Sequence, residues 1–381
     1  MVSVTLELRP RLRSCNVFIY MHGAAEPESI RLKLNEDAII FGIGEKTTTL
    51  SSSSIKIVPK SLSLLRVTSN WISFRVQTKP INSSYGSFGT EILGAELVEI
   101  DTVLRDLKGN TILPTENSEF RLSCVNCKND IIKTVSFKRV LPLPRTDCDP
   151  SEWFCCKHDE NNESSTLLSP RKSDYFYGAY YCVLHKNNLC DHVKIDKKVV
   201  VCGKCLSIIG MPWDNVSVKI WNCCIEYKTS KNPLPMKIST ALDDFLLVIL
   251  DSVDTVPGSR LLLEATEGNH THYLLLQPMD WHLDLLVEPE ILPNNKNLVN
   301  LRRIRVIKVL YKYGEKKADI ISNSSEFQQC HVALPIMLAG VEQLLLSTKR
   351  VPPSYRVADE YYIGYVYVQK VTENGVLPKK Q

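Results

Sequence analysis

The chain has 381 residues, of which 44% are hydrophobic and 23% are charged. Both values are close to those of ordinary globular proteins, which excludes a fibrous structure or disorder of the whole chain. Lys and Arg outnumber Asp and Glu by only 46 to 42. Because the basic residues are also scattered, we expect no direct nucleic-acid partner. The length suits two or three domains.

No hydrophobic segment is long enough for a membrane span. The longest apolar run is residues 245–250, whereas crossing a bilayer takes about 20 residues. The first residues alternate polar and apolar side chains and do not form a signal peptide. We therefore expect an intracellular protein without a membrane partner, whose 13 cysteines are free for metal binding or chemistry instead of disulfides.

Residues 1–120 contain short segments with alternating polar and apolar side chains, separated by polar turns. The clearest of them are residues 2–8, 29–34, 61–67 and 71–76. This spacing of short strands is typical of a β-sandwich or an open barrel. We expect a first domain of this kind.

Residues 121–210 contain nine of the cysteines and many Pro, Asp, Asn and Ser residues. Such a loop-rich segment cannot bury a large apolar core, and bound metal can supply the missing folding free energy. We expect a segment held together by a metal ion.

Residues 211–381 have an α+β pattern. A strand is expected at 216–227, followed by a helix from Thr240 to Ser252, in which Thr240 and Asp243 form a capping pattern. Further strands are expected near 261–265, 273–277, 283–288, 302–311 and 361–369, and a second helix near 335–347. The expected fold class of the whole chain is therefore α+β and β-rich, with three consecutive domains.

Two Cys-x-x-Cys pairs stand out in the middle segment. They are Cys124 with Cys127, and Cys202 with Cys205. In this spacing a tight turn lets two thiolates bind one tetrahedral zinc ion, and two such turns complete a closed structural site. The alternatives are four ordinary buried cysteines or a redox-active pair of the thioredoxin type.

Between these pairs lies a proline-rich stretch that ends in further metal-ligand residues. Prolines at 142, 144 and 150 precede Trp153, Cys155, Cys156 and His158. Prolines favour an extended backbone that suits insertion into the groove of a partner. A second zinc-binding turn within the chain, or a surface loop fixed by Trp153, is the alternative.

These motifs together resemble the HECT-like ubiquitin ligase family. The resemblance is carried, in order, by Ser123-Cys-x-x-Cys127, Leu141-Pro-Leu-Pro144, Trp153 with Cys155, Cys156 and His158, Asp174-Tyr-Phe-Tyr-Gly178, Val201-Cys-x-x-Cys205, Ile307–Tyr311 and Leu334-Pro335. It implies a protein of the cytoplasm and nucleus that accepts ubiquitin from a conjugating enzyme and passes it to protein substrates. The last domain, 211–381, would carry this activity.

The resemblance implies two binding sites for protein partners. The helix with Leu242, Phe245, Leu246 and Ile249 would bind the conjugating enzyme, although such an apolar stripe also suits a protein core. The segment at about 138–160 is similar to the BRAT-type inhibitor motif. It would insert Trp153, Cys155, Cys156 and His158 into the zinc endonuclease of pre-mRNA 3′-end cleavage and polyadenylation, in order to inhibit or escort that enzyme.

A ligase of this type needs a reactive cysteine that forms a thioester with ubiquitin. Cys330 is the candidate, because it precedes His331 and the start of a helix, and both a base and a helix N-terminus can lower a thiol pKa. Cys330 as an ordinary loop thiol is the alternative. For the whole chain, the alternative is a non-enzymatic, zinc-stabilised binding protein that acts as a nuclease inhibitor or assembly factor.

Overall fold

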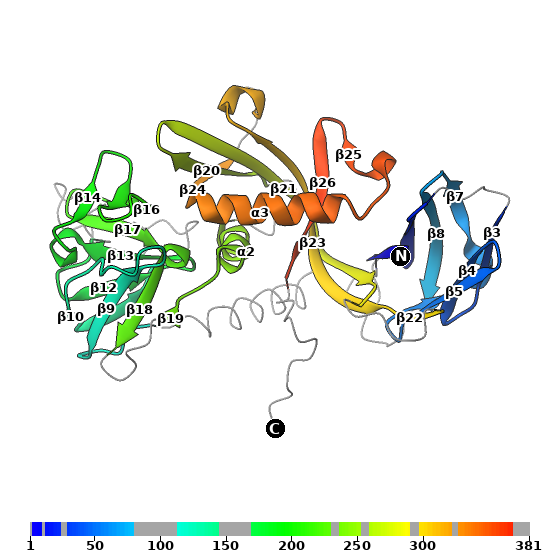
Figure 1. Cartoon of the computed structure of the whole chain (residues 1–381), viewed down its shortest axis with the longest axis horizontal. Helices are drawn as coiled ribbons and strands as arrows, with labels where there is room; N and C mark the ends of the chain where they lie inside the picture. Colours follow the sequence, from blue (N-terminus) through cyan, green and yellow to red (C-terminus); the bar gives the residue numbers. More distant parts are fainter. Residues whose placement is uncertain are drawn as a thin grey trace, which may run out of the picture. The chain divides into compact units, whose positions relative to one another are not determined.

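The structure is a computed structural model that describes residues 2–9, 12–23, 29–79, 113–144, 169–229, 236–252, 259–289, 297–321 and 327–368. These residues form mainly β-strands, together with the α-helices α2 (Ala241–Ser252) and α3 (Leu334–Thr348) (Figure 1). The β-rich α+β class expected from the sequence agrees with this content. Within these ranges, no helix is long and apolar enough to cross a membrane.

The chain divides into two compact units, and each is discontinuous in sequence. Unit 1 comprises residues 1–100, 277–312 and 342–381, and unit 2 comprises residues 101–276 and 313–341. This division differs from the three consecutive domains expected from the sequence. The physical reason is strand pairing, since Thr5 lies opposite Val287 and Leu8 lies opposite Asp284.

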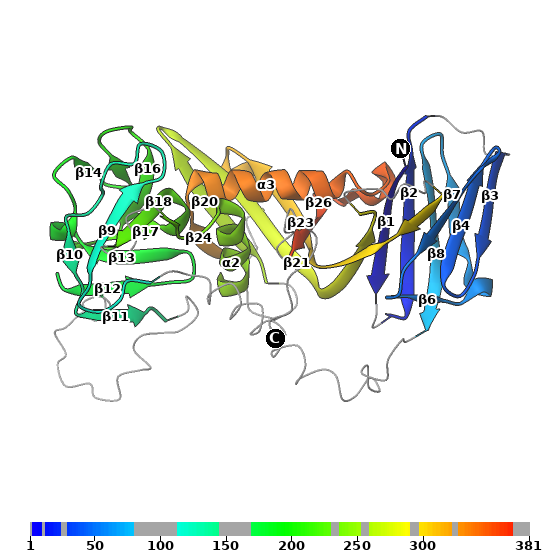
Figure 2. The same cartoon turned by 60° about the horizontal axis from the view of Figure 1, so that its bottom comes forward.

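Unit 1 contains two β-sheets that share one hydrophobic core. Strands β1, β2 and β8 run side by side, with β3 and β4 in the second sheet (Figure 2). The core between the sheets includes Leu6 and Val17 from the first sheet and Phe41 from the second. A second cluster, with Phe18 and Leu285, covers the other face of the first sheet.

The bounds of these strands are as follows. The first sheet has the order β25 (Val357–Ala358), β26 (Tyr361–Tyr367), β23 (Arg302–Gly314), β21 (His270–Val287), β1 (Val2–Arg9), β2 (Ser14–Met21), β8 (Trp71–Lys79) and β6 (Lys56–Ile57), with β7 (Ser63–Val67) also paired to β8. The second has the order β22 (Leu298–Asn300), β5 (Lys46–Ser51), β4 (Ala38–Ile43) and β3 (Ile30–Leu34).

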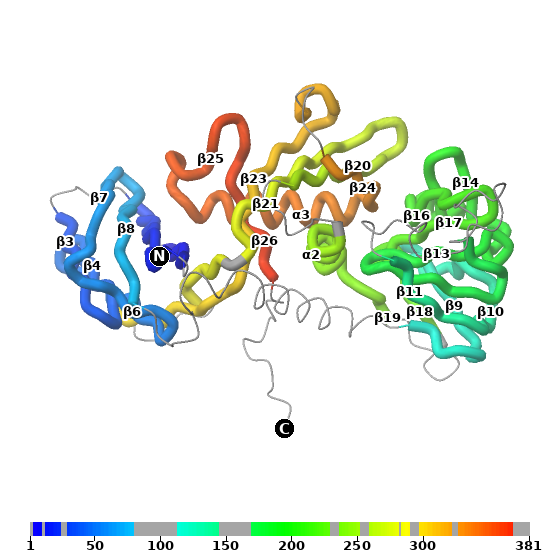
Figure 3. The backbone as a smooth tube through the Cα atoms, turned by 180° about the vertical axis from the view of Figure 1, so that it is seen from behind, coloured from blue at the N-terminus to red at the C-terminus, as the bar shows by residue number. Residues whose placement is uncertain are grey.

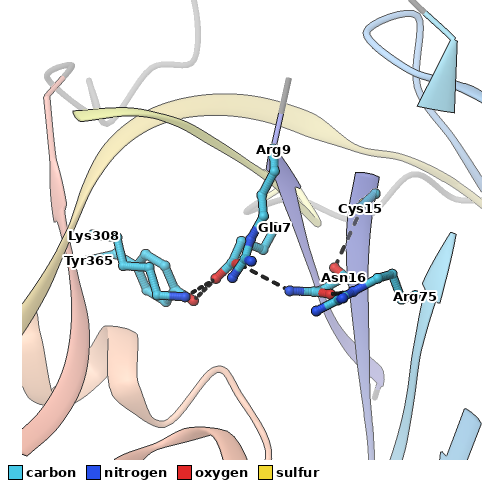
Figure 4. A network of polar contacts seen from close by, with 7 residues as sticks. All are labelled: Glu7, Arg9, Cys15, Asn16, Arg75, Lys308 and Tyr365. Atoms are coloured by element: carbon cyan, nitrogen blue, oxygen red, sulfur yellow. Dashed lines mark hydrogen bonds and ion pairs between the residues drawn. The ribbon is translucent and has the colours of Figure 1, made fainter. Parts of the chain in front are cut away.

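A buried carboxylate connects the first and last parts of unit 1. Glu7 in β1 accepts hydrogen bonds from Lys308 in β23 at 2.9 Å and from Asn16 in β2 at 3.0 Å, and also from Arg9 and Tyr365 (Figure 4). Burial would raise the pKa of Glu7, but Lys308, Arg9 and Tyr365 lower it to about 2. The carboxylate is therefore charged and fully paired inside the unit.

Unit 2 also contains two β-sheets. The smaller has the order β10 (Val135–Ser136), β9 (Glu119–Cys124), β18 (Ile225–Thr229) and β19 (Met236–Lys237). The larger has the order β11 (Arg139–Pro142), β12 (Asp174–Tyr177), β13 (Tyr181–His185), β17 (Ser217–Trp221), β16 (Ile208–Pro212), β15 (Val200–Cys202) and β14 (Val193–Ile195). The ring of Phe120 in β9 contacts that of Tyr175 in β12, so this contact packs the two sheets together.

One sequence expectation for this part of the chain needs correction. The described residues of the middle segment carry short strands of both sheets, which turns and loops connect. The single strand expected at 216–227 is two strands, β17 and β18, which belong to different sheets. The short 3-10 turn η7 (Asn222–Cys224) separates them, and it lets the chain pass from one sheet to the other.

The remaining strands of unit 2, β20 (Leu261–Glu267) and β24 (Gln328–His331), belong to the same 11-stranded sheet as β21. Strand β20 pairs antiparallel with the first part of β21 and parallel with β24, and Figure 3 shows β20 and β24 side by side. Helix α2 is almost wholly buried, and Phe245 packs so closely on Gly340 of α3 that an added Cβ there would lie 2.3 Å from the ring. The other 3-10 turns are η3 (Pro59–Ser61), η6 (Lys186–Asn188), η8 (Lys317–Asp319) and η9 (Pro353–Tyr355).

Candidate metal centre

The two Cys-x-x-Cys pairs meet in unit 2. Cys124 is the last residue of β9, and Cys202 is the last residue of β15. Their Sγ atoms and those of Cys127 and Cys205 all lie within 4.8 Å of one another. The cluster therefore joins the end of a strand in the smaller sheet to the end of a strand in the larger sheet.

Both pairs adopt the same backbone turn. In the first, the Lys128 N–H donates to the Cys124 carbonyl at 2.9 Å, and in the second, the Leu206 N–H donates to the Cys202 carbonyl at 2.8 Å. Lys128 and Leu206 also share a left-handed backbone, with φ of +62° and +64°. Such a conformation is uncommon outside glycine, asparagine and aspartate. Two matched turns of this kind place four thiols around one point.

Contacts outside the thiols hold these turns in place. Lys128 Nζ lies 2.6 Å from Glu226 Oε1 in β18, and the Val125 N–H donates to the Cys224 carbonyl at 3.0 Å. Asn126 Nδ2 donates to Ser207 Oγ at 2.7 Å and so connects the first turn to the second. The four-cysteine arrangement is therefore supported by the protein backbone and by its neighbours.

The sulfur separations fit a tetrahedral zinc ion. Cys124 Sγ lies 3.7 Å from Cys205 Sγ, and Cys127 Sγ lies 3.6 Å from Cys202 Sγ. Zinc–sulfur bonds of about 2.3 Å in tetrahedral geometry require a separation of about 3.8 Å. A disulfide would need about 2.0 Å, so these are four separate thiols. Four thiolate ligands leave no open position for water, which favours a structural role over a catalytic one.

The thiols differ in how readily they ionise. Burial raises the pKa of Cys124 to about 12 and also raises that of Cys202. Burial acts in the same direction on Cys127, but hydrogen bonds from Asn129, Cys205 and Cys202 lower its pKa to about 6. A bound dication would favour the thiolate form of all four residues.

The expected conjugating-enzyme contacts on α2 are mostly internal. Phe245, Leu246 and Ile249 are buried, and only Leu242, which is 41% exposed, reaches the surface. Thr240 caps the helix as expected, because its Oγ1 accepts a hydrogen bond from the Asp243 N–H at 3.1 Å. The apolar stripe therefore forms core, and the first turn of α2 carries its exposed part.

The other expected site residues are placed as follows. Trp153, Cys155, Cys156 and His158 lie outside the described residues. Cys330 lies in β24 and is buried, whereas its neighbour His331 points outward. The cysteine cluster thus brings together four of the predicted site residues. Cys330 is distant from them in the sequence and lies in a different sheet.

One buried basic residue was missed by sequence reasoning. Lys219 lies in β17 and is buried among aromatic rings. The available signal was a single lysine in an otherwise apolar strand, Val218-Lys-Ile-Trp221. A lysine at an inward strand position is rare, because burial of its charge is costly.

The fold and the cluster define a β-rich protein with a group of four cysteines that could hold a metal ion. The sequence model of the family described as HECT-like ubiquitin-conjugating enzyme (E2)-binding matches residues 7–363. The chain belongs to this family. No curated protein and no solved structure matches the chain.

Proposed function

We propose that this protein is a HECT-like ubiquitin-protein ligase, which binds a ubiquitin-conjugating enzyme, accepts its ubiquitin and passes it to protein substrates. Membership of the E2-binding family, over residues 7–363, is the observation that carries this proposal. The four-cysteine cluster holds a structural zinc ion in it. The ion joins the two sheets of unit 2, and the ligase chemistry lies elsewhere.

In this proposal the conjugating enzyme contacts the first turn of α2. Leu242 is the exposed apolar residue of that helix, and exposed apolar anchors often carry much of the energy of an interface. Phe245, Leu246 and Ile249 support the turn from the core, so their substitution acts on the fold before it acts on binding.

The test is calorimetric titration of the full chain with a panel of conjugating enzymes. We expect Leu242→Asp to weaken binding at least tenfold, which corresponds to about 1.4 kcal/mol. Leu338→Asp is the matched control, because Leu338 lies in α3 and is 50% exposed. If no conjugating enzyme binds the unmodified chain, the proposal fails.

The alternative is a non-enzymatic, zinc-stabilised protein that inhibits or escorts the pre-mRNA endonuclease through Trp153, Cys155, Cys156 and His158. The described residues that flank this segment, in β11 and β12, are held to each other by several contacts. Strands β11 and β12 pair in parallel, and the Leu143 N–H donates to the Tyr177 carbonyl at 2.7 Å. Arg139 and Asp174 also form an ion pair between the same two strands.

This alternative is tested by nuclease inhibition with the full chain. Alanine at Cys155, Cys156 and His158 should abolish the inhibition, whereas Leu242→Asp should not change it. Inhibition that survives the triple substitution would rule out the nuclease role, and it would leave the binding of the conjugating enzyme unaffected.

A further inference from the structure

Three leucines at one edge of a sheet in unit 1 are exposed to solvent. Leu62 is 41% exposed, Leu64 is 53% exposed and Leu65 is 49% exposed. Leu62 follows the 3-10 turn η3, and the other two lie in β7, which among the described strands pairs only with β8 (Figure 1). We call these three residues the leucine patch. Neighbouring apolar side chains that stay exposed in a folded protein often mark a binding surface.

The backbone of β7 keeps these side chains at the surface through a strained bulge. The bulge lies between Ser63 and Arg66, so that Leu64 and Leu65 together face one residue of β8. Leu64 has φ of +53° there, a conformation that residues with a Cβ rarely adopt. In a regular strand successive side chains point to opposite faces, and a bulge changes this direction. Backbone strain of this kind is concentrated at functional sites.

Hydrogen bonds hold this segment in place. Ser61 Oγ donates to the Val58 carbonyl at 2.6 Å and accepts from the Gln77 N–H at 2.7 Å. Ser63 Oγ donates to the Arg75 carbonyl at 3.3 Å. The two serines therefore attach the backbone around the leucine patch to β8, which contains Gln77 and Arg75. A surface that is held in this way before binding loses little conformational entropy when a partner arrives.

The charges that flank the leucine patch are positive. Lys60 precedes the patch and Arg66 follows it; both are exposed, and no ion pair among the described residues includes either of them. The sequence has no Asp or Glu from Lys46 to Thr90. Glu36, whose carbonyl accepts from a residue of β6, is already paired with Lys79 at 2.7 Å. Such a surface attracts carboxylates and repels a second copy of itself.

These features fit a protein segment better than a lipid surface. Sequence clusters that bind anionic lipids contain about four to eight cations, whereas residues 56–66 contain three. The bulge also interrupts the regular hydrogen-bonding edge of β7, which disfavours the addition of a further strand. Recognition therefore depends on side chains, with apolar groups of the partner against the leucines and carboxylates against Lys60 and Arg66.

We propose that the leucine patch, together with Lys60 and Arg66, is a docking surface for a protein partner that presents an exposed segment of apolar and acidic residues. The inference goes beyond the proposed function. The patch lies in unit 1, whereas α2 with its Leu242 lies in unit 2, so the two surfaces can be tested separately. The small size of the patch indicates weak and reversible binding.

The first experiment measures the binding of a fluorescent peptide, in which leucine and glutamate alternate, to the full chain by fluorescence anisotropy. We expect Lys60→Glu and Leu62→Ser each to raise the Kd by about five- to tenfold, and added salt to raise it too. The controls in unit 1 are Lys349→Glu, at an exposed lysine, and Val357→Ser, at a valine that is 48% exposed in β25. Both should leave the Kd unchanged. Absence of binding, or equal binding by all variants, would overturn the proposal.

The second experiment uses Leu64→Gly to separate binding from folding. Glycine adopts a positive φ without a steric penalty, so this variant should unfold at a higher urea concentration than the unmodified chain. It should nevertheless bind the peptide several-fold more weakly, because it lacks the leucine side chain. A purely structural role of Leu64 predicts no such opposition. Binding by Leu64→Gly that equals binding by the unmodified chain would refute the part of Leu64 in docking.

Further probes identify the kind of partner. A peptide with lysine in place of glutamate, and one with serine in place of leucine, should both bind about tenfold more weakly. Vesicles with phosphatidylserine that bind the chain through Leu62, while the acidic peptide does not bind, would show a lipid-binding surface and refute the proposal. Dimerisation that Leu62→Ser abolishes would assign the patch to a second copy, with the same consequence.

Titration with the conjugating enzyme distinguishes a failure of this inference from a failure of the proposed function. The Lys60→Glu and Leu62→Ser variants should bind that enzyme as the unmodified chain does. A peptide that fails to bind a chain with normal affinity for the conjugating enzyme refutes the docking surface alone.

Discussion

Leu64 has a left-handed backbone with φ of +53°, and it lies in a β-bulge of β7 between Ser63 and Arg66. Its side chain is 53% exposed, so packing contributes little to hold it there. A left-handed conformation costs a residue with a Cβ roughly 1–2 kcal/mol. The residue therefore stores strain at the surface of unit 1.

Leu64→Gly should relieve this strain. We expect the free energy of unfolding to rise by up to about 1 kcal/mol, because glycine adopts a positive φ without a steric penalty. Urea unfolding of the full chain measures the change. Leu65→Gly is the control: Leu65 is similarly exposed but has no positive φ, so glycine there should lower stability. Equal effects of the two substitutions would contradict the role of strain.

Glu7 predicts how the stability of unit 1 depends on pH. Its pKa in the fold is about 2, below the ordinary 4.5, so the folded state binds its proton less readily than the unfolded chain does. Glu7 therefore contributes stability above about pH 4.5, and this contribution is lost as the pH falls from there to about 2.

The measurement is thermal unfolding between pH 2 and pH 6. Glu7→Gln should be less stable at neutral pH, because Lys308 loses a charged partner, and it should lose less stability on acidification. Glu36→Gln is the control, since the pKa of Glu36 is also lowered, by Lys79, but Glu36 lies at the surface. A Glu7→Gln profile parallel to the original would contradict the assignment to this carboxylate.

At the scale of the elements, the close contact of α2 with α3 predicts how a substitution at Gly340 changes stability. Alanine usually favours a helix over glycine by about 1 kcal/mol, but a Cβ at Gly340 would lie 2.3 Å from a ring carbon of Phe245. Gly340→Ala should therefore destabilise the protein. The cost of overpacking is roughly 1–3 kcal/mol, and the helix preference of alanine offsets only part of it.

Thermal unfolding of Gly340→Ala checks this prediction. Leu338→Ala, on the exposed side of the same helix, should change stability by no more than about 0.5 kcal/mol. An increase in stability for Gly340→Ala would mean that α3 can move away from Phe245. In that case α2 would be less tightly held than its burial indicates.

At the scale of the whole molecule, the cysteine cluster predicts the effect of metal removal. Native mass spectrometry should find one zinc ion per chain, and chelation should release it. Because the cluster joins the two sheets of unit 2, its loss should lower the thermal midpoint of that unit, by several degrees for each kcal/mol lost. Unit 1 contains none of the four ligands, so its unfolding should not change.

Cys202→Ser removes one of the four ligands of the cluster. Its control is Cys190→Ser, because Cys190 is a half-exposed cysteine outside the cluster. Cys202→Ser should lose the zinc ion and lower the midpoint of unit 2, whereas Cys190→Ser should do neither. If Cys202→Ser retains both the metal and the midpoint, the four cysteines do not form a structural zinc site.

Much of the local structure followed from the sequence by itself. The helix from Thr240 to Ser252 and the strands near 261–265 and 302–311 agree with the structure to within a few residues. The four cluster cysteines were also predicted, because two Cys-x-x-Cys turns are short-range features whose geometry depends on few residues. The resemblance to the HECT-like family was correct for the same reason, since it rests on ordered short motifs.

Only the tertiary structure decided which of these features meet. Strand pairing between residues almost 300 positions apart, such as Thr5 with Val287, defines the two units, and no local pattern specifies such a pair. The same is true of burial: it places Phe245 in the core, leaves Leu242 at the surface, and brings Tyr180 to Cys330 in place of His331. Local chemistry fixed the candidate residues, and long-range packing selected the neighbours that determine what they can do.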